Sequence, residues 1–545
     1  MLTAADPCSW PVLQGCPPPS CAPAFPSAAA EVIIAADSAV WKVGAPGGTG
    51  IQALAQRFRC RRACVSETLL RELLAGLAHF LLAIVATVHI LLTKTEVRAA
   101  IAWTGLVWLA PLFGPVSYLL FGINRIRRSV GRMRQVRGAH TAEHQAATGR
   151  QAHGGGSVAP VPDGWRALAT LTDRISAEPL EGGNCIEPLL DGDQAYPAMI
   201  EAIAGARRSI SLATYIFDRG IVADAFADAL EAAVARGVEV RVLIDGLGAR
   251  YSRPPIRGEL QRRGIRVASF LPVRFPLPNP YANLRNHRKI LVVDGGIAFT
   301  GGLNIRDACL LARPSAFPTR DTHFRLRGPV VHHLQDAFVF DWRFATGERL
   351  LGETWFPPVT AVGDMLARGI ADGPDETRDA LLLTLLGALA AARRRVRIVT
   401  PYFLPDPPLI DALRVTALRG VDVEILIPGR GNLRLVQWAQ MAQLKPVLRG
   451  GCRVLLTRAP FDHSKLMVVD GSWSLVGSAN WDPRSLRLNF EYVVECYSAA
   501  LAASLESIIA AKRDGAHELS RAELDARPLW RKLRDGIAWL MQPYL

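Results

Sequence analysis

The sequence predicts an α/β protein in which two similar lobes share one active site, preceded by a transmembrane helical hairpin. Three features lead to this expectation. Two long uncharged segments lie near the start, a later segment is duplicated with strands alternating with helices, and a short His-Lys motif occurs once in each copy. The 545 residues, half of them apolar, are enough for more than one domain.

The N-terminal part of the chain is expected to lie in a membrane. Residues 1–66 are rich in Pro, Ala, Gly and Cys and lack periodicity, which predicts a poorly ordered extension. Residues 67–137 hold two uncharged segments, Leu73–Leu92 and Ala99–Ile123, each long enough to cross a bilayer core of about 30 Å. A buried hairpin of a soluble protein is the alternative, but two adjacent segments favour two spans. Pro111 is expected to kink the second helix.

The distribution of arginines predicts the orientation of these helices. Positive charge is usually retained on the cytoplasmic side. The loop between the segments is short and carries both signs, whereas arginines precede and follow the pair. We therefore expect a multi-pass membrane protein, with both ends and everything after residue 124 in the cytoplasm. The arginines are Arg57, Arg59, Arg61, Arg62 and Arg71 before it, and Arg125, Arg127, Arg128, Arg132, Arg134 and Arg137 after it.

The rest of the chain contains an internal duplication. Ala206–Thr214 corresponds to Ala392–Thr400, and Val238–Asp245 corresponds to Val421–Pro428. Each pair is followed by further strand and helix patterns, which predicts two α/β lobes. The predicted organisation is a Gly-rich linker at 138–164, a first lobe at 165–350, a connector at 351–380 and a second lobe at 381–545.

The C-terminal tail has the pattern of an amphipathic helix. Its apolar residues recur at helical spacing, with basic residues between them. Such a helix could lie in the membrane interface near the site, or it could pack on the second lobe. The sequence leaves both readings open. The apolar residues are Trp530, Leu533, Ile537, Leu540 and Met541, and the basic ones are Arg531, Lys532 and Arg534.

Each copy carries the motif H-x-K-x-x-x-x-D. The first is His287, Lys289 and Asp294, and the second is His463, Lys465 and Asp470. With 11 His and 7 Lys in 545 residues, about 0.14 H-x-K pairs are expected by chance (11 × 7 / 545), before the Asp is required. Both motifs read as strand, tight turn and strand, because Asp-Gly suits a turn with positive φ.

The motif places its polar side chains together. Residues i and i+2 of a strand point to one face, so the His and Lys of each copy project together. Asn304 and Asn480, ten residues after each motif Asp, can join the same faces. Two lobes that face each other then surround one cleft with two imidazoles, two ammonium groups and two amides.

This set of groups suits phosphodiester chemistry. One His can attack phosphorus, while the other protonates the leaving oxygen and then deprotonates the acceptor. The Lys and Asn side chains can stabilise charge on the non-bridging oxygens. These fixed donors can replace a metal, and the Cys60-x-x-x-Cys64 pair has no second half of a metal site. We therefore expect neither a metal nor a cofactor.

The two motifs resemble the duplicated signature of the phospholipase D superfamily. The uncharged pair of segments, Asp482–Glu491 and Arg531–Asp535 are similar to bacterial cardiolipin synthases. The resemblance covers residues from about 70 to the end. It implies two phospholipase D-like lobes that close on one site, and an enzyme that joins two phosphatidylglycerols through a phosphohistidine and releases glycerol.

The resemblance also implies roles for individual residues. It makes His287 the nucleophile and His463 the general acid and base, although the two motifs alone are too symmetrical to decide. Carboxylates downstream of each motif orient the histidines in this family, and Asp321 follows the first motif as Glu491 follows the second. Asp294 and Asp470 are expected to brace the turns. Ser478 could donate to phosphate, whereas its counterpart Gly302 has no side chain to do so.

Alternative functions remain open at the level of sequence. A hydrolase would use water as the acceptor in the same site. The net charge of +14 favours an anionic partner, so a nuclease of this fold is possible on charge alone. The double span and short linker favour anionic phospholipids at a membrane, and no nucleic acid is expected. A scaffold with an inactive site is disfavoured by the intact motifs. The oligomeric state is left open.

Overall fold

A computed structural model describes residues 31–36, 39–44, 49–94, 96–123, 161–272, 284–374 and 379–542. The chain divides into two compact units, Met1–Asn124 and Arg125–Leu545, and each is described by itself. Within the range 1–66, strands β1 (Glu31–Ala36) and β2 (Ala39–Gly44) pair antiparallel. Helix α1 (Thr49–Thr93) also begins there, so it is longer than the apolar segment that predicts it. The remainder of the expected extension lies outside the described residues, as does most of the expected linker.

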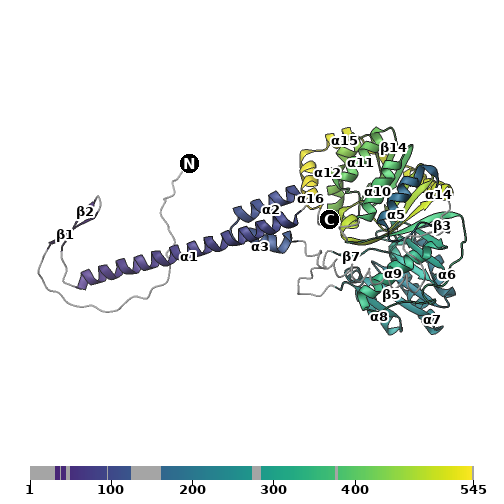
Figure 1. Cartoon of the computed structure of the whole chain (residues 1–545), viewed down its shortest axis with the longest axis horizontal. Coiled ribbons are helices and arrows are strands. Elements are labelled where there is room, and N and C mark those ends of the chain that lie inside the picture. Colours follow the sequence, from purple (N-terminus) through teal and green to yellow (C-terminus); the bar gives the residue numbers. More distant parts are fainter. Residues whose placement is uncertain are drawn as a thin grey trace. The chain divides into compact units, whose positions relative to one another are not determined.

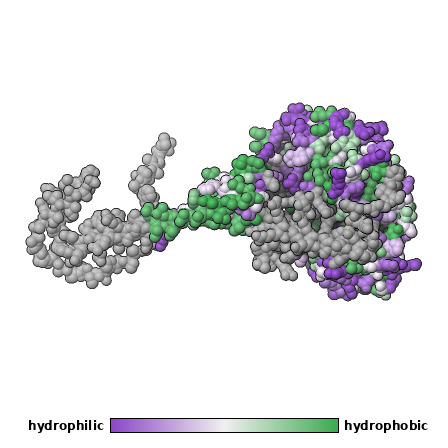
Figure 2. Space-filling model, in the orientation of Figure 1, coloured by the Kyte–Doolittle hydropathy of each residue, from purple (hydrophilic) through white to green (hydrophobic). Residues whose placement is uncertain are grey.

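The apolar part of α1 could cross a membrane. Its stretch Thr68–Thr93 has 26 residues and a mean hydropathy of 2.2. Most of its large apolar side chains are exposed, and Figure 2 shows a nearly continuous hydrophobic surface there. Among the described residues it is the only helix that is long and apolar enough to span a bilayer.

The second uncharged segment forms three shorter pieces. They are α2 (Val97–Leu109), α3 (Phe113–Ser117) and the π-helix η1 (Tyr118–Gly122). The interruption falls at Pro111, where a kink was expected, and Leu112 adopts φ 60°. Because α2 is shorter than the roughly 20 residues that a span needs, a second span stays a prediction.

Helices α1 and α2 contact each other within this unit. Trp108 Nε1 donates a hydrogen bond to Thr87 Oγ1 at 3.0 Å, and the Trp108 ring packs edge-on against Phe80. A buried cluster of Ala83, Ile90, Val107 and Tyr118 lies in the same unit.

The C-terminal unit is built on one mixed sheet with a symmetrical strand order. The order is β20-β15-β14-β13-β17-β18-β19-β12-β3-β11-β9-β8-β4-β5-β6. Each lobe contributes the same seven-strand pattern, and the two patterns meet at the centre where β12 pairs antiparallel with β3. The first lobe supplies β3 (Glu181–Leu190), β4 (Ser209–Thr214), β5 (Glu239–Asp245), β6 (Arg266–Phe270), β8 (Ile290–Val293), β9 (Ile297–Gly301) and β11 (Thr322–Arg327). The second supplies β12 (Met365–Asp372), β13 (Arg395–Val399), β14 (Asp422–Pro428), β15 (Arg453–Thr457), β17 (Leu466–Val469), β18 (Trp473–Gly477) and β19 (Asn489–Tyr497), with β20 (His517–Glu518) at its edge.

The range 351–380, expected to connect the lobes, therefore contains a central strand. Strand β12 lies there and pairs with β19 on one side and β3 on the other. Its Arg368 is fully buried and ion-paired with the buried Glu495 at 2.6 Å. A charged residue inside a buried strand hides the apolar pattern by which such strands are recognised.

Helices cover the sheet in equivalent positions in the two lobes. Figure 1 shows the helices of the first lobe in teal and those of the second in green to yellow, on separate halves of this unit. The helices of the first lobe are α6 (Asp191–Gly205), α7 (Ile221–Ala235), α8 (Arg257–Arg262) and α9 (Val330–Thr346). Those of the second are α10 (Ala380–Ala391), α11 (Pro407–Leu418), α12 (Arg434–Arg449), α13 (Pro483–Arg487), α14 (Ala499–Arg513), α15 (Arg521–Ala526) and α16 (Leu529–Leu540). Helix α5 (Arg166–Ile175) packs against α10.

One hydrophobic core joins the two lobes. Phe324 and Phe338 of the first lobe belong to the same buried cluster as Val468, Tyr492 and Leu505 of the second. Close packing of this kind resists relative movement. The core therefore holds the two motifs in a fixed relation to each other.

Candidate active site

The acidic residue of each motif braces its turn. Asp294 has φ 51°, and its carboxylate accepts hydrogen bonds from the backbone N–H groups of Arg207, Arg208 and Ser209 at 2.8, 2.7 and 3.0 Å. These amides lie at the start of β4, the strand next to β8. Although it belongs to the motif, Asp294 does not line the cavity described below, so its place in the structure is that of a brace for the hairpin.

The second copy repeats this arrangement. Asp470 also has φ 51° and accepts hydrogen bonds from the backbone of Arg393, Arg394 and Arg395 at 2.8, 2.8 and 2.9 Å. The repetition explains why an Asp stands at this position in both copies. Its carboxylate holds the turn against the start of β13.

The histidine of each motif is reached by a strand that crosses to the other lobe. Strand β7 (Arg285–Asn286) pairs in parallel with β19 of the second lobe, and the backbone N–H of His287 donates to Phe490 O at 2.9 Å. In the same way β16 (Phe461–Asp462) pairs with β10 (Thr319–Arg320) of the first lobe, and the N–H of His463 donates to Arg320 O at 2.7 Å.

The carboxylate partners of the histidines are consequently exchanged between lobes. His287 Nδ1 lies 3.0 Å from the carboxylate of Glu491, and His463 Nδ1 lies 2.9 Å from that of Asp321. The two carboxylates chosen from the sequence thus lie beside the two histidines, each next to the histidine of the other lobe. Spacing along the chain does not reveal which lobe an exchanged strand will reach.

Ser478 differs from its expected role. It is fully buried, and its hydroxyl donates to Glu491 Oε2 at 2.5 Å, so it supports a carboxylate and does not line the cavity. At the equivalent Gly302 a β-carbon would lie 2.4 Å from Asp321 Oδ1. The absent side chain makes room for that carboxylate. The Ser and Gly difference therefore concerns how the two carboxylates are held.

Burial lowers the pKa of both imidazoles, which favours their neutral form before substrate binds. For His287 burial lowers the pKa, the Glu491 carboxylate opposes this, and Lys289 adds to it. For His463 burial and then the neighbouring Lys465 lower the pKa to about 4. A carboxylate that accepts from Nδ1–H leaves Nε2 with a free lone pair. Each ring is thus prepared to act through Nε2.

The lysines are buried beside the histidines. Burial lowers the pKa of Lys289 to about 7 and that of Lys465 to about 8. Lys289 Nζ donates to His287 O at 2.6 Å, and Lys465 Nζ donates to His463 O and lies 2.9 Å from His463 Nδ1. An anion placed close to these groups would favour their charged forms.

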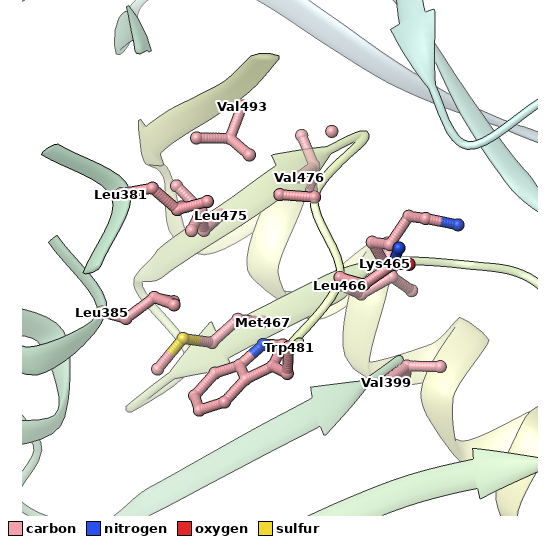
Figure 3. Close-up of a pocket in the computed structure, with 13 residues that line it drawn as sticks. Leu381, Leu385, Val399, Lys465, Leu466, Met467, Leu475, Val476, Trp481 and Val493 are labelled. Carbon is pink, nitrogen blue, oxygen red and sulfur yellow. The ribbon is translucent and has the colours of Figure 1, made fainter. Parts of the chain in front are cut away.

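An apolar group of side chains lies behind Lys465. A small cavity of about 20 Å³ is lined there by Leu385, Met467 and Trp481. Figure 3 shows these side chains to one side of Lys465, with its ammonium group directed away from them. The apolar surroundings explain why burial is the main cause of the lowered pKa.

The histidines of the two motifs face a cavity of about 490 Å³, whose lining does not include Lys289, Lys465, Asp294 or Asp470. Both histidines line it, together with Asn304 and Asn480, which the sequence places near them. Asn304 Oδ1 accepts from Ile216 N at 3.1 Å, and Asn480 Nδ2 donates to Ser485 Oγ at 3.2 Å.

The remaining walls of the cavity differ in character. The lining includes a set of basic and aromatic residues, a set of mainly apolar residues, and the carboxylates of Asp321 and Asp482. The first set is Tyr215, Tyr251, Arg285, Arg306 and Arg484, and the second is Tyr402, Leu404, Leu433, Val436 and Phe461.

Two tyrosines of the site are missed by the motif search. Tyr215 lies with its ring centroid 5.4 Å from that of His287, and Tyr402 lies 6.2 Å from His463. They stand one position apart in the repeat, because Thr214-Tyr-Ile-Phe217 corresponds to Thr400-Pro-Tyr-Phe403 in the duplication. Extension of the repeat by three residues would have found both.

Comparison with known proteins gives the same two-lobe pattern. The family described as "Cardiolipin synthase, PLD-like domain" matches residues 199–313 and 385–512, and "Phospholipase_D-nuclease N-terminal" matches residues 81–122. "Cardiolipin synthase A" of Pseudomonas aeruginosa is 34% identical, over 89% of this chain and 98% of the relative. "Major cardiolipin synthase ClsA" of Bacillus subtilis is 30% identical, over 87% of this chain and 99% of the relative.

A solved structure agrees with the fold. The phosphatidylserine synthase of Haemophilus influenzae superposes with a TM-score of 0.56, at 15% identity, and covers 69% of this chain and 100% of that one. At this identity the likeness concerns the fold alone.

Proposed function

The chain belongs to the cardiolipin synthase family of phospholipase D-like proteins, and we propose on this premise that it is a membrane phosphatidyltransferase that joins two phosphatidylglycerols into cardiolipin and releases glycerol. The observation that carries the proposal is the exchanged pairing of His287 with Glu491 and of His463 with Asp321 around one cavity. It gives a single site two oriented imidazoles, one for each half of a double displacement.

In the first step His287 Nε2 attacks the phosphorus of one phosphatidylglycerol. The bond from phosphorus to the glycerol oxygen breaks, and that oxygen takes the Nε2 proton from the cationic form of His463, which the bound anionic phosphate favours. Glycerol leaves, His463 becomes neutral and a phosphatidyl-histidine remains. Phosphorylation makes the His287 ring cationic while Nδ1 keeps its proton. Burial would raise the pKa of Glu491, but His287 and Lys289 outweigh it and lower that pKa, so the carboxylate stays ionised and stabilises the cation.

In the second step His463 Nε2, now neutral, takes the proton from the free hydroxyl of a second phosphatidylglycerol. The hydroxyl oxygen attacks phosphorus, the bond to His287 breaks, and cardiolipin forms. Lys289 and Lys465 stabilise the negative charge on the non-bridging oxygens in both steps, since their ammonium groups lie beside the two rings.

The arginines that line the cavity suit the phosphate of the second lipid. Both substrates carry a phosphodiester, so two phosphates must occupy neighbouring positions when the second step occurs. Arg285, Arg306 and Arg484 line the cavity, and guanidinium groups bind phosphate oxygens in a bidentate manner. We expect these arginines to hold the acceptor phosphate while the motifs hold the reacting one.

The products of the purified chain test this proposal. Incubation with phosphatidylglycerol should give cardiolipin and glycerol in equal amounts, and His463→Ala should abolish both. Phosphatidic acid without cardiolipin would replace the transferase with a hydrolase that uses water. Cleavage of DNA that survives competition by lipid would favour a nuclease, and unchanged synthesis by His463→Ala would remove this site from the reaction.

We further infer that the chain crosses the membrane twice, with its lobes on the cytoplasmic side of a bacterial inner membrane. Support comes from the apolar stretch Thr68–Thr93, the second uncharged segment after it, and the arginines on both flanks. Alkaline phosphatase fused after Glu96 should be active, because that loop would be outside, and fusion after Gly138 should be inactive. Activity of the second fusion would reverse the orientation.

A further inference from the structure

Helix α16 presents its apolar side to the outside. A helix on the surface of a globular protein normally packs with its apolar stripe inward. In α16 the buried residues are Asp535 and Ala538. The large apolar side chains are exposed instead, with exposed fractions of 58% for Trp530, 59% for Leu533, 66% for Ile537 and 68% for Leu540. These four, at helical spacing, are called the outer face of α16.

The small and polar side of α16 fixes this orientation. Ala538 packs in a buried cluster with Leu404, Val436 and Ala439, the last two on α12. Arg534 stacks over the ring of Trp438 at 4.4 Å. Figure 1 shows α16 beside α12 in the second lobe.

Polar contacts at both ends of α16 support this packing. Asp535 is ion-paired with Arg527 at 2.6 Å and with Arg534 at 2.7 Å. Gln542, just after the helix, donates to Leu404 O at 3.1 Å. Rotation of the helix to turn its apolar side inward would break the ion pair of Asp535 with Arg527 and the stacking of Arg534 on Trp438.

Helix α16 lies next to one wall of the active-site cavity. Leu404 and Val436, which pack on Ala538, also line the cavity. Leu433 lines the cavity as well and is half exposed, as is Leu435 in the first turn of α12. One layer of side chains therefore separates α16 from the cavity.

Positive charge borders the outer face. Arg531 and Lys532 are exposed on the same helix, and Arg434 is exposed beside Leu433 and Leu435 on α12. Aromatic and aliphatic residues on one side of a helix, with Lys and Arg at the border, are typical of helices that lie in the headgroup region of a bilayer. Basic residues near such a surface add attraction to anionic lipids.

We propose that the outer face of α16 docks on the surface of a bilayer containing anionic phospholipid. Because α16 lies next to the cavity, a substrate then passes from the bilayer into the site. The proposal rests on the proposed function, because a lipid substrate must leave its bilayer to reach a buried phosphate site. The N-terminal anchor holds the chain at the membrane, and α16 sets which side of the lobe faces it.

The test compares two forms of one substrate with the full-length protein. Leu533→Asn combined with Ile537→Asn removes apolar area from exposed positions, and Leu418→Asn is the matched control, since Leu418 is 72% exposed on α11 of the same lobe. Turnover is measured on vesicles of phosphatidylglycerol and phosphatidylethanolamine, and on monomeric dihexanoyl-phosphatidylglycerol. We expect the double variant to lose about tenfold or more on vesicles and to stay within about twofold of wild type on monomers.

Two results would overturn the proposal. The first is unchanged turnover of vesicles by the double variant. The second is an equal loss on both substrates, which would mean that the face acts through folding or through the site. A change of oligomeric state in the double variant, measured by light scattering in detergent, would assign the face to a second copy of the chain and would also overturn it.

A photolabel separates this proposal from the proposed function. Phosphatidylglycerol with a diazirine in its acyl chain should label the peptide that contains α16 in wild-type protein in vesicles, and should label the double variant much less. This labelling requires no turnover, so it decides the docking proposal even if the chain makes no cardiolipin. Equal labelling of both proteins would refute docking through α16.

Discussion

The exchanged carboxylates predict different defects for two similar substitutions. Glu491→Gln removes the charge that faces the His287 ring, and Asp321→Asn removes the charge that faces His463. The first should slow formation of the phosphatidyl-enzyme. The second should slow its consumption, because His463 is needed to activate the acceptor hydroxyl.

The structure sets the size of the effect. Each carboxylate makes one charged hydrogen bond to Nδ1, at 3.0 Å for His287 and 2.9 Å for His463. Such a bond contributes about 1.5–3 kcal/mol, and about 1.4 kcal/mol corresponds to tenfold in rate. We therefore expect overall synthesis to fall by about 10- to 100-fold in either variant.

Rapid quenching distinguishes the two variants. After mixing with radiolabelled phosphatidylglycerol, Asp321→Asn should accumulate labelled protein, and Glu491→Gln should show less than wild type. The control is Glu506→Gln, which should behave as wild type. Glu506 lies on α14 and forms a partly exposed ion pair with Arg395. The opposite pattern, with accumulation in Glu491→Gln, would refute the assignment of His287 to the nucleophile and His463 to the acid and base.

Three further predictions concern the parts of the site. Asp470→Ala removes the acceptor of three backbone hydrogen bonds, so the free energy of unfolding of the second lobe should fall by about 2 kcal/mol or more. The loss should be seen as a lower melting temperature with no gain of activity. The pKa of Lys289 is lowered to about 7, so its ammonium group is present below that pH and lost above it. KM for phosphatidylglycerol should therefore rise as pH increases from 6 to 9. A flat KM would show that this charge does not bind substrate. Gly302→Ala places a β-carbon against Asp321 and should lower kcat about tenfold while KM changes little; an unchanged kcat would mean that the carboxylate need not hold His463 in place.

Local patterns in the sequence anticipate much of this architecture. The repeat of Ala206–Thr214 and Ala392–Thr400 gives β4 and β13, and the Asp-Gly dipeptides fall at the turns between β8 and β9 and between β17 and β18. These features depend on neighbours in the chain, so periodicity and turn chemistry are sufficient to find them.

Features that depend on contacts between distant segments cannot be predicted from these local patterns. Glu491 and Asp321 were recognised as carboxylates, but their exchange follows from β7 and β16 crossing to the opposite lobe. The sequence pattern places β12 in a connector, because Arg368, which is ion-paired with Glu495, interrupts the apolar run. Ser478 was read as a phosphate ligand because a sequence does not show that its hydroxyl is buried against a carboxylate.

For the C-terminal tail the sequence predicts a helix but not which of its sides is buried. Its apolar spacing predicted an amphipathic helix, and the structure has α16 there. Spacing alone could not decide which side is buried. Ala538 and Asp535 occupy the inner side, where Ala538 packs on Val436 and Ala439 of α12 and Asp535 pairs with Arg527.

Identification of the residue that carries the phosphatidyl group tests the central claim most directly. His463→Ala should form the phosphatidyl-enzyme slowly and be unable to pass it to an acceptor, so protein quenched after incubation with phosphatidylglycerol should carry the group. Peptide mapping by mass spectrometry at alkaline pH, where phosphohistidine survives, should place it on His287, and His287→Ala should carry none. A phosphatidyl group on any other residue, or cardiolipin formed by either variant at the wild-type rate, would contradict a single site shared by the two lobes.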